Sequence, residues 1–282
     1  MPCLTDRLKQ HLAQLVRERD PYLAPVGHFF VQRYIQQQLQ QWGAVEQDEF
    51  PVRSRSHVNL ILNLPPAQPD RRMKPPILVG AHYDAVIGSP GADDNATGVA
   101  VLLEMARLLT EHPPRSPVRL VAFDLEEYDL LGSRHYAALL FQQGQSLRLM
   151  IALEMLGYRD RTPGSQRYPP GLKYFYPSQG DFIGLIGNWS AIPDLIRLSR
   201  AIRKAGIACE WLPAPQKGQL IPDTRRSDHA PFWDQGYRAL MATDTANLRN
   251  PHYHQPSDRW DTLDLDFLTG ICQGLVEGIR RL

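Results

Sequence analysis

Short apolar runs that end in metal-ligating side chains are the feature that most constrains how this sequence folds. Three runs rich in aliphatic residues are separated by helical patterns and cover residues 77–81, 118–123 and 149–153. His82, Glu127 and Glu154 stand at or just beyond the ends of these runs. Strands that alternate with helices predict a parallel sheet, and such sheets bind ligands at the carboxyl ends of their strands. The sequence therefore predicts an α/β fold in which one edge of the sheet gathers these side chains.

A further ligand-type residue, Asp94, lies in a turn-rich segment that opens into an apolar helical run at residues 99–109. Asp and Asn are ordinary N-cap residues, so a structural role is one interpretation. The turn follows the sequence His82-Tyr83-Asp84 by only ten residues, which favours a role in the same site. Imidazole nitrogen and carboxylate oxygen suit Zn²⁺, and the lack of thiolate ligands argues against a structural zinc site. The predicted metal ligands are His82, Asp94, Glu127, Glu154 and His254.

Five motifs occur in a fixed order over about residues 57–280 and give the chain a family resemblance. They are His82-Tyr83-Asp84, Gly91-Ala92-Asp93-Asp94-Asn95, Asp124-Leu125-Glu126-Glu127, Gly132-Ser133-Arg134 and Tyr253-His254. In these motifs the chain resembles the zinc-aminopeptidase/glutaminyl-cyclase family. The resemblance implies an exopeptidase fold with two Zn²⁺ ions per chain, with one ion as the alternative. It implies that Asp94 bridges both ions. His82 and Glu154 would complete one coordination shell, and Glu127 and His254 the other.

Glu126 stands next to a predicted ligand without being one, which suits a general base. Two metal ions about 3.5–4 Å apart polarise a carbonyl and lower the pKa of a shared water. Glu126 is expected to take the proton from the attacking water and pass it to the leaving amine. Asp84 lies two residues beyond His82 and is predicted to accept the other ring N–H of that imidazole. A turn residue is the alternative role for Asp84.

The sequence departs from the family pattern at Glu154, where the family usually places Asp. The extra methylene of Glu moves its oxygens by roughly 1 Å unless the backbone retreats. The ion shared by His82, Asp94 and Glu154 is therefore expected to be the weaker one. The resemblance also implies a cis peptide bond between Asp94 and Asn95.

Polar residues near these motifs are predicted to support the ligands. The family pattern His-x-x-x-Asp selects His254 over His252 as a ligand and leaves Asp258 as an orienting residue or a helix cap. The segment Ser227-Asp228-His229 resembles one that lines the family's site, and a structural helix start is the alternative for its histidine. The predicted supporting residues are Asp228, Tyr253 and Asp258.

The composition is that of an ordinary globular enzyme. A length of 282 residues suits one α/β domain, and a hydrophobic fraction of 43% is enough for a sizeable core. The net charge of +1 indicates neither nucleic acid nor an anionic membrane as a partner. No apolar stretch approaches the roughly 20 residues that span a bilayer. The isolated cysteines Cys3, Cys209 and Cys272 and the charged N-terminal residues favour a reduced, cytoplasmic protein. The oligomeric state is left open.

The expected architecture is a single three-layer α/β/α domain over residues 1–282, with a mixed, mostly parallel sheet flanked by helices. Two amphipathic helices within residues 1–43 should pack on this domain. The other expectations are helices at residues 4–17, 28–42 and 264–282, an antiparallel strand pair at 46–52 and 57–64, and loops at 65–76, 157–180 and 213–226. The last two loops lack periodicity and are expected to form walls of the pocket.

Three functions are compatible with the resemblance. The first is a metal-dependent aminopeptidase acting on the N-terminus of a peptide, and the second is a zinc-dependent glutaminyl cyclase that forms N-terminal pyroglutamate. A non-catalytic family member is disfavoured, because every ligand position and Glu126 hold competent side chains. The segment Asn95-Ala96-Thr97-Gly98 looks more like the peptidases, which favours the first function. Aromatic residues that could line an apolar pocket, although such residues are more often core, are Tyr158, Phe175, Trp189, Trp211 and Tyr253.

Overall fold

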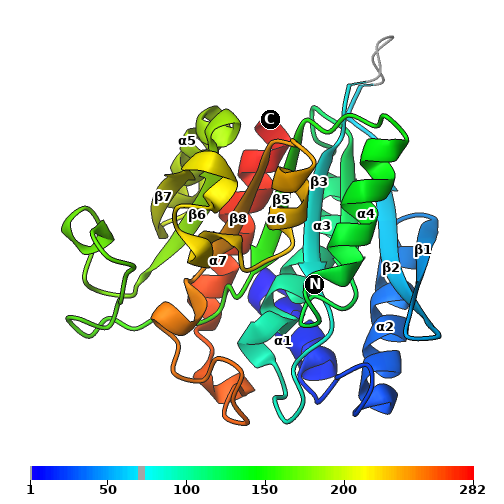
Figure 1. Cartoon of the computed structure of the whole chain (residues 1–282), viewed down its shortest axis with the longest axis horizontal. Coiled ribbons are helices and arrows are strands. Elements are labelled where there is room, and N and C mark those ends of the chain that lie inside the picture. Colours follow the sequence, from blue (N-terminus) through cyan, green and yellow to red (C-terminus); the bar gives the residue numbers. More distant parts are fainter. Residues whose placement is uncertain (1, 69–73) are drawn as a thin grey trace.

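A central sheet of eight strands organises the molecule, which we describe from a computed structural model over residues 2–68 and 74–282 (Figure 1). The strands are β1 (Val45–Val52), β2 (Arg55–Leu64), β3 (Ile77–His82), β4 (Val118–Phe123), β5 (Leu149–Glu154), β6 (Phe182–Asn188), β7 (Ala208–Ala214) and β8 (Ala239–Thr243). Their order across the sheet is β1-β2-β4-β3-β5-β8-β6-β7.

The four central strands of the sheet run in the same direction. β4 pairs parallel with β3, β3 with β5, and β5 with β8. Antiparallel pairs join β1 to β2, β2 to β4 and β6 to β8, and the outer pair of β6 and β7 is again parallel. The sheet is therefore mixed and mostly parallel, which confirms the predicted fold class. The carboxyl ends of β3, β4 and β5 consequently meet at one edge.

Helices cover both faces of the sheet, as expected for three layers. They are α1 (Leu4–Leu15), α2 (Pro25–Gln40), α3 (Gly98–Glu111), α4 (Leu131–Gln142), α5 (Ile192–Lys204), α6 (His229–Asp234) and α7 (Leu265–Arg281). Figure 1 shows α4 and α6 in front of the sheet, with α3 and α7 behind it. The side chains of α1, α2 and α5 belong to the same core as those of α3 and α7, whereas α4 and α6 supply the second core.

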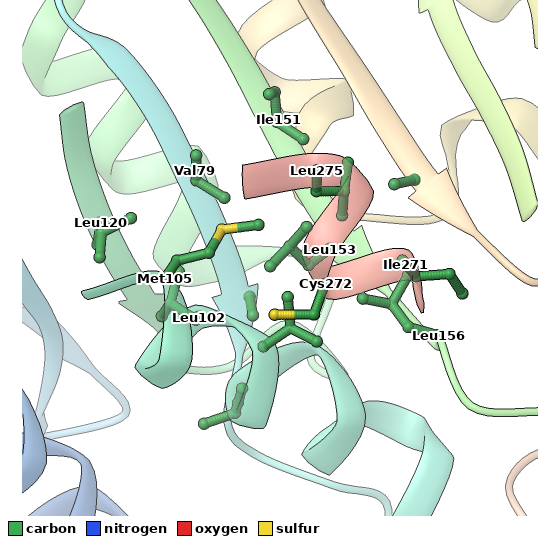
Figure 2. Close-up of a cluster of buried hydrophobic side chains, with 14 of the residues drawn as sticks. Val79, Leu102, Met105, Leu120, Ile151, Leu153, Leu156, Ile271, Cys272 and Leu275 are labelled. Carbon is green, nitrogen blue, oxygen red and sulfur yellow. The ribbon is translucent and has the colours of Figure 1, made fainter. Parts of the chain in front are cut away.

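The two cores follow from the alternation of side chains along the strands. Ile151 and Leu153 of β5 face the larger core, whereas Met150 and Ala152 face the smaller one. All residues of β3 and β5 are buried, as is typical of strands covered on both faces. Figure 2 shows the larger core, in which strand side chains meet those of α3 and α7. Those labelled in the figure are Val79, Leu102, Met105, Leu120, Ile151, Leu153, Leu156, Ile271, Cys272 and Leu275.

The N-terminal helices differ slightly from their predicted bounds. The first ends at Leu15 rather than at residue 17, and the second begins at Pro25 rather than at residue 28. Pro25 is the first residue of its helix, a position where the fixed φ and the missing N–H of proline are tolerated. Leu12 and Ile35 of these helices are buried in the larger core. The helices therefore share the core of the sheet instead of forming one of their own.

The segments outside the core strands largely agree with the sequence expectations. The antiparallel pair is formed by β1 and β2, and the last helix covers Leu265–Arg281. The predicted loop at 65–76 falls partly on residues 69–73, which lie outside the described residues. Residues 157–180 and 213–226 contain only short helical turns besides the end of β7 and one isolated β-bridge. None of the helices formed by the described residues combines the length and apolar composition that a bilayer crossing requires.

Candidate metal centre

The structure brings the five predicted ligands together at the carboxyl edge of the sheet. His82 is the last residue of β3, and Glu154 is the last residue of β5. Glu127 follows β4 in the next loop, Asp94 lies in the turn before α3, and His254 lies in the loop between β8 and α7. Buried strands and the start of a buried helix thus fix four of the five positions.

The carboxylate of Asp94 lies between two histidines. Its Oδ1 lies 3.3 Å from Nε2 of His82, and its Oδ2 lies 3.1 Å from Nε2 of His254. On the first side, Oε2 of Glu154 lies 3.6 Å from Nε2 of His82. On the second side, Oε2 of Glu127 lies 3.3 Å from Nε2 of His254. In each group the three ligand atoms lie within 4.8 Å of one another, so the arrangement offers two sites that share one carboxylate.

Several ligand atoms of this cluster are buried without a hydrogen-bond partner among the described residues. They include Nε2 of His82, Nε2 of His254 and Oε1 of Glu127. An unpaired buried polar atom is costly, and a metal ion would satisfy all three. Imidazole nitrogens and carboxylate oxygens are ligands that Zn²⁺ and other divalent first-row metals accept. The residues therefore fit a pair of metal ions.

The charges of the cluster also favour a cation. Burial lowers the pKa of His254, but contacts with Asp94 and Glu127 outweigh burial and raise that pKa to about 10. The pKa of His82 is likewise lowered by burial, yet neighbouring carboxylates raise it well above its usual value. Burial and the Asp94 carboxylate raise the pKa of Glu127 to about 7. Carboxylates therefore dominate the field at the centre and attract either protons or metal ions.

Asp84 connects His82 to the loop that follows β4. Its Oδ1 lies 3.4 Å from Nδ1 of His82, on the side of the ring away from Asp94. The same carboxylate accepts the backbone N–H groups of Glu126 and Glu127 at 3.1 Å each. The sequence predicted only the contact with the histidine. The hydrogen bonds to the loop add a second role, because they hold the backbone of the two glutamates.

Glu126 lies beside the ligands, with its Oε2 4.0 Å from Nε2 of His82. Burial raises the pKa of Glu126 well above its usual range, and the carboxylates of Glu154 and Glu127 add to this effect. Glu127, but not Glu126, contacts His254. This difference supports Glu127 as the ligand and leaves Glu126 free to handle a proton.

The backbone around Asp94 is held by hydrogen bonds. The carboxylate of Asp258 accepts the N–H groups of Asp93 and Asp94 at 2.9 and 3.1 Å. The peptide bond between Asp94 and Asn95 is cis, as the resemblance implied. Asp258 was predicted as an orienting residue or a helix cap, and its contacts are those of an orienting residue.

Two residues that contact or hold the ligands were not assigned such a role from the sequence. Ser227 donates from its hydroxyl to Oε2 of Glu154 at 2.7 Å. The side chain of Asn95 donates to the carbonyl of Leu153 at 2.7 Å and accepts the N–H of Met155 at 3.1 Å. Asn95 thereby fixes the chain on both sides of Glu154. Such contacts depend on which segments meet in the folded chain, and no short sequence pattern predicts them.

Tyr253 stacks on the ring of His254, with ring centroids 3.8 Å apart and an interplanar angle of 23°. The hydroxyl of Tyr253 accepts a hydrogen bond from the exposed guanidinium of Arg226 at 2.9 Å. The stack orients the imidazole of His254, and the hydrogen bond to Tyr253 holds the positive charge of Arg226 close to it.

The remaining candidates lie outside the ligand groups formed by the described residues. Asp228 is buried nearby, and burial raises its pKa to about 7. His229 is also buried, with Nε2 2.8 Å from the carbonyl of Thr224, and burial lowers its pKa to about 4. His252 contacts the hydroxyl of Ser257 at 2.9 Å. His229 and His252 are thus structural residues of α6 and of a loop.

An apolar cavity of ≈ 80 Å³ lies between the two long loops. Residues of both long loops line it, among them Tyr176 and Ile221, together with Trp211 of β7. Gly184 in its wall pairs with Thr243, and Thr243 pairs with Glu154 on the next strand. Neighbouring strands lie about 4.8 Å apart, so the backbone of Gly184 lies roughly 10 Å from that of Glu154, and none of the five predicted ligands lines the cavity. Two other aromatic candidates, Trp189 and Phe175, are exposed on the surface.

Comparison with protein families gives one match that covers most of the chain. The model of peptidase family M28 matches residues 59–185 and 196–277. The uncharacterized protein YfbL of Escherichia coli is 37% identical over 260 residues, which cover 86% of this chain and 77% of that protein.

Two solved structures show what the fold is similar to. BSAP, a zinc aminopeptidase from Bacillus subtilis, is 25% identical with a TM-score of 0.59, and the match covers 81% of this chain and 52% of BSAP. The chain thus spans about half of that enzyme. A glutaminyl cyclase of Bacteroides thetaiotaomicron is 19% identical with a TM-score of 0.68, covering 99% of this chain and 97% of the cyclase. At that identity the second likeness concerns the fold alone.

Proposed function

The chain belongs to peptidase family M28, and from this premise we propose that it is a metal-dependent aminopeptidase that hydrolyses the first peptide bond of a peptide. The observation that carries the proposal is the position of Asp94, whose two carboxylate oxygens face two separate histidines. A shared carboxylate with one imidazole and one further carboxylate on each side is suited to a pair of zinc ions. When bound, zinc supplies polarisation of the scissile carbonyl and acidification of water.

The side chains of the centre supply the proton transfers and the orientation. Glu126 takes a proton from the attacking water and delivers it to the leaving amine. Its position supports this role, because its Oε2 lies 4.0 Å from Nε2 of His82, next to the ligands and without a contact to His254. Asp84 accepts the backbone N–H of Glu126 and lies 3.4 Å from Nδ1 of His82, so one carboxylate contacts both the ligand and the segment that carries the base. The excess of carboxylates attracts the positively charged N-terminus of a peptide.

A glutaminyl cyclase is the second candidate, because the family resemblance includes that activity. The full-length match to the Bacteroides cyclase agrees with it in fold alone. The two activities differ in the nucleophile, since a cyclase uses the substrate's own amine where a peptidase uses water. The apolar cavity between the two long loops, two strands away from Glu154, suits a peptidase that accepts an apolar side chain near the N-terminus of its substrate.

Metal analysis together with two substrates tests the proposal. The purified protein, loaded with zinc, is offered a leucyl arylamide and a peptide with N-terminal glutamine. Two zinc ions per chain with release of the arylamine are expected. One zinc ion with formation of pyroglutamate would establish the cyclase instead. Hydrolysis that is unaffected when a strong chelator removes the metal would exclude metal-dependent catalysis.

Both ligand sets combine one imidazole with two carboxylates, but the position of Glu154 predicts that their zinc affinities differ. The side chain of Glu154 is one methylene longer than that of Asp, and its Oε2 also accepts a hydrogen bond from Ser227. Dialysis against a mild chelator should therefore remove the ion shared with His82 before the one shared with His254. Glu154→Asp should strengthen that site if the longer side chain of Glu places its oxygens poorly, and should weaken it if the backbone has retreated to suit Glu, since the oxygen would then fall roughly 1 Å short. Simultaneous loss of both ions from the wild type would contradict the asymmetry.

A further inference from the structure

Arg19 is a buried cation that lies against the metal centre without belonging to it. It lies between α1 and α2, in a part of the chain that precedes the region matched by the family model. The residue is only 1% exposed. A buried guanidinium is costly unless all its donors are satisfied. The acceptors that these N–H donors contact therefore indicate the role of Arg19.

The guanidinium joins the two segments that carry His82 and Asp94. Its Nε donates to the carbonyl of Tyr83 at 2.9 Å, directly after His82. Its Nη2 donates to the carbonyls of Gly91 and Asp94 at 2.9 and 3.1 Å. Asp94 is therefore held through its N–H by Asp258 and through its carbonyl by Arg19.

The remaining donors tie the same group to the N-terminal segment and to the start of the turn. Nη1 donates to the carbonyl of Pro90 at 2.7 Å and to those of Leu15 and Arg17 at 3.3 and 3.2 Å. Within the described residues, every hydrogen bond of Arg19 goes to a backbone carbonyl. The planar fork of arginine suits this use, because its donors have fixed relative directions.

The turn at Gly91 leaves room for the guanidinium of Arg19. Gly91 has a φ of +58°, and a Cβ there would lie 2.7 Å from Nη2 and 2.8 Å from Nη1 of Arg19. The same Cβ would lie 2.3 Å from the carbonyl oxygen of Asp94. The close approach of the arginine to the turn thus requires glycine.

We propose that Arg19 is a positioning residue of the metal centre. Its guanidinium fixes the backbone after His82 and at Asp94, and so sets the separation of the two side chains that share an ion. This inference rests on the proposed function for the identity of the metal but concerns affinity, not turnover. Residues that orient ligands from outside the coordination shell typically change metal affinity by about 10–100-fold.

Zinc affinity of two variants tests the inference. Arg19→Lys keeps the buried charge but cannot reach Tyr83 and Asp94 together, and Arg19→Met removes the charge as well. Competition with a chromogenic chelator, below the melting temperature of each metal-free variant, measures the affinity. Both variants should bind zinc about 10–100-fold more weakly than the wild type.

Arg148→Met is the matched control. Arg148 donates two hydrogen bonds to Asp194, at 2.8 and 3.0 Å, and precedes β5 at the strand end opposite to Glu154. Its loss should lower the melting temperature of the metal-free protein while zinc affinity stays that of the wild type. A general loss of stability is thereby separated from a loss of positioning.

The outcomes distinguish this inference from the proposed function. Wild-type affinity in Arg19→Lys, or tighter binding in either variant, overturns the positioning role, since charge alone would then account for the residue. A wild-type chain that binds zinc but hydrolyses neither substrate contradicts the proposed function, whereas a weakened Arg19→Lys variant would still support the inference.

Discussion

Glu126→Gln should lower turnover by about 10²–10⁴-fold or more while the zinc content stays that of the wild type. Glutamine keeps the shape of the side chain but cannot take a proton from water. Glu126 lies 4.0 Å from His82 and shares a third possible ligand group with His82 and Glu127, but it belongs to neither of the two groups that contain Asp94, so its replacement leaves those two groups intact. Steady-state kinetics on a leucyl arylamide, with metal analysis of the same preparation, measures both quantities.

Glu127→Gln is the control for that experiment, because the two glutamates are adjacent and both are held by Asp84. Glu127 contacts His254, so its replacement should weaken one ion as well as reduce turnover. If Glu126→Gln loses as much zinc as Glu127→Gln, the base and the ligand have been exchanged in our assignment.

The sequence was sufficient for the parts of the fold where one local pattern decides the structure. The runs before His82 and Glu154 are buried on both faces, so they read as continuous apolar strands. Strands β6 and β7 are harder to recognise. β6 contains two glycines, Gly184 and Gly187, and β7 is an edge strand that is only partly buried and contains Pro213. Their pairing is set by tertiary contacts that no short window of sequence contains.

Four of the predicted ligands stand at or near an element that has its own signal, whereas His254 was selected by the family pattern. Ser227 belongs to a segment that resembles one lining the family's site but had no role of its own, and Arg19, an arginine between two helices, has an ordinary surface pattern. Their roles arise from contacts between segments 73 and 75 residues apart, to Glu154 and to Asp94 respectively. The sequence thus predicted which residues meet at this edge of the sheet, including Asp84 and Asp258, whereas the contacts of Ser227 and Arg19 require the fold.

The charges around Asp94 explain why its loss should weaken zinc binding more than the loss of any other ligand. Although burial raises the pKa of Asp94, contacts with His254 and His82 hold it well below its usual range. The group therefore stays ionised among several carboxyls whose pKa values are raised. A carboxylate that lies between two imidazoles is suited to be a shared ligand.

Asp94→Asn should therefore weaken both zinc ions, each by more than about 100-fold, because the loss of a shared ligand exceeds the 10–100-fold typical of residues outside the coordination shell. The amide is neutral and offers one oxygen where the carboxylate offers two. Turnover should fall with the metal. Glu154→Gln, by contrast, should weaken only the ion shared with His82. Equilibrium competition with a chelator, resolved into two binding steps, measures both variants.

Asp93→Asn is the matched control for this prediction. Asp93 adjoins Asp94 and is equally buried, but its carboxylate accepts the N–H of Gly157 and the amide of Asn250, both at 2.8 Å, and faces no ligand. Burial and the neighbouring Asp244 raise the pKa of Asp93 well above its usual value. The variant should keep both zinc ions. If Asp94→Asn instead retains one ion at wild-type affinity, Asp94 serves a single site and the two-metal centre is wrong.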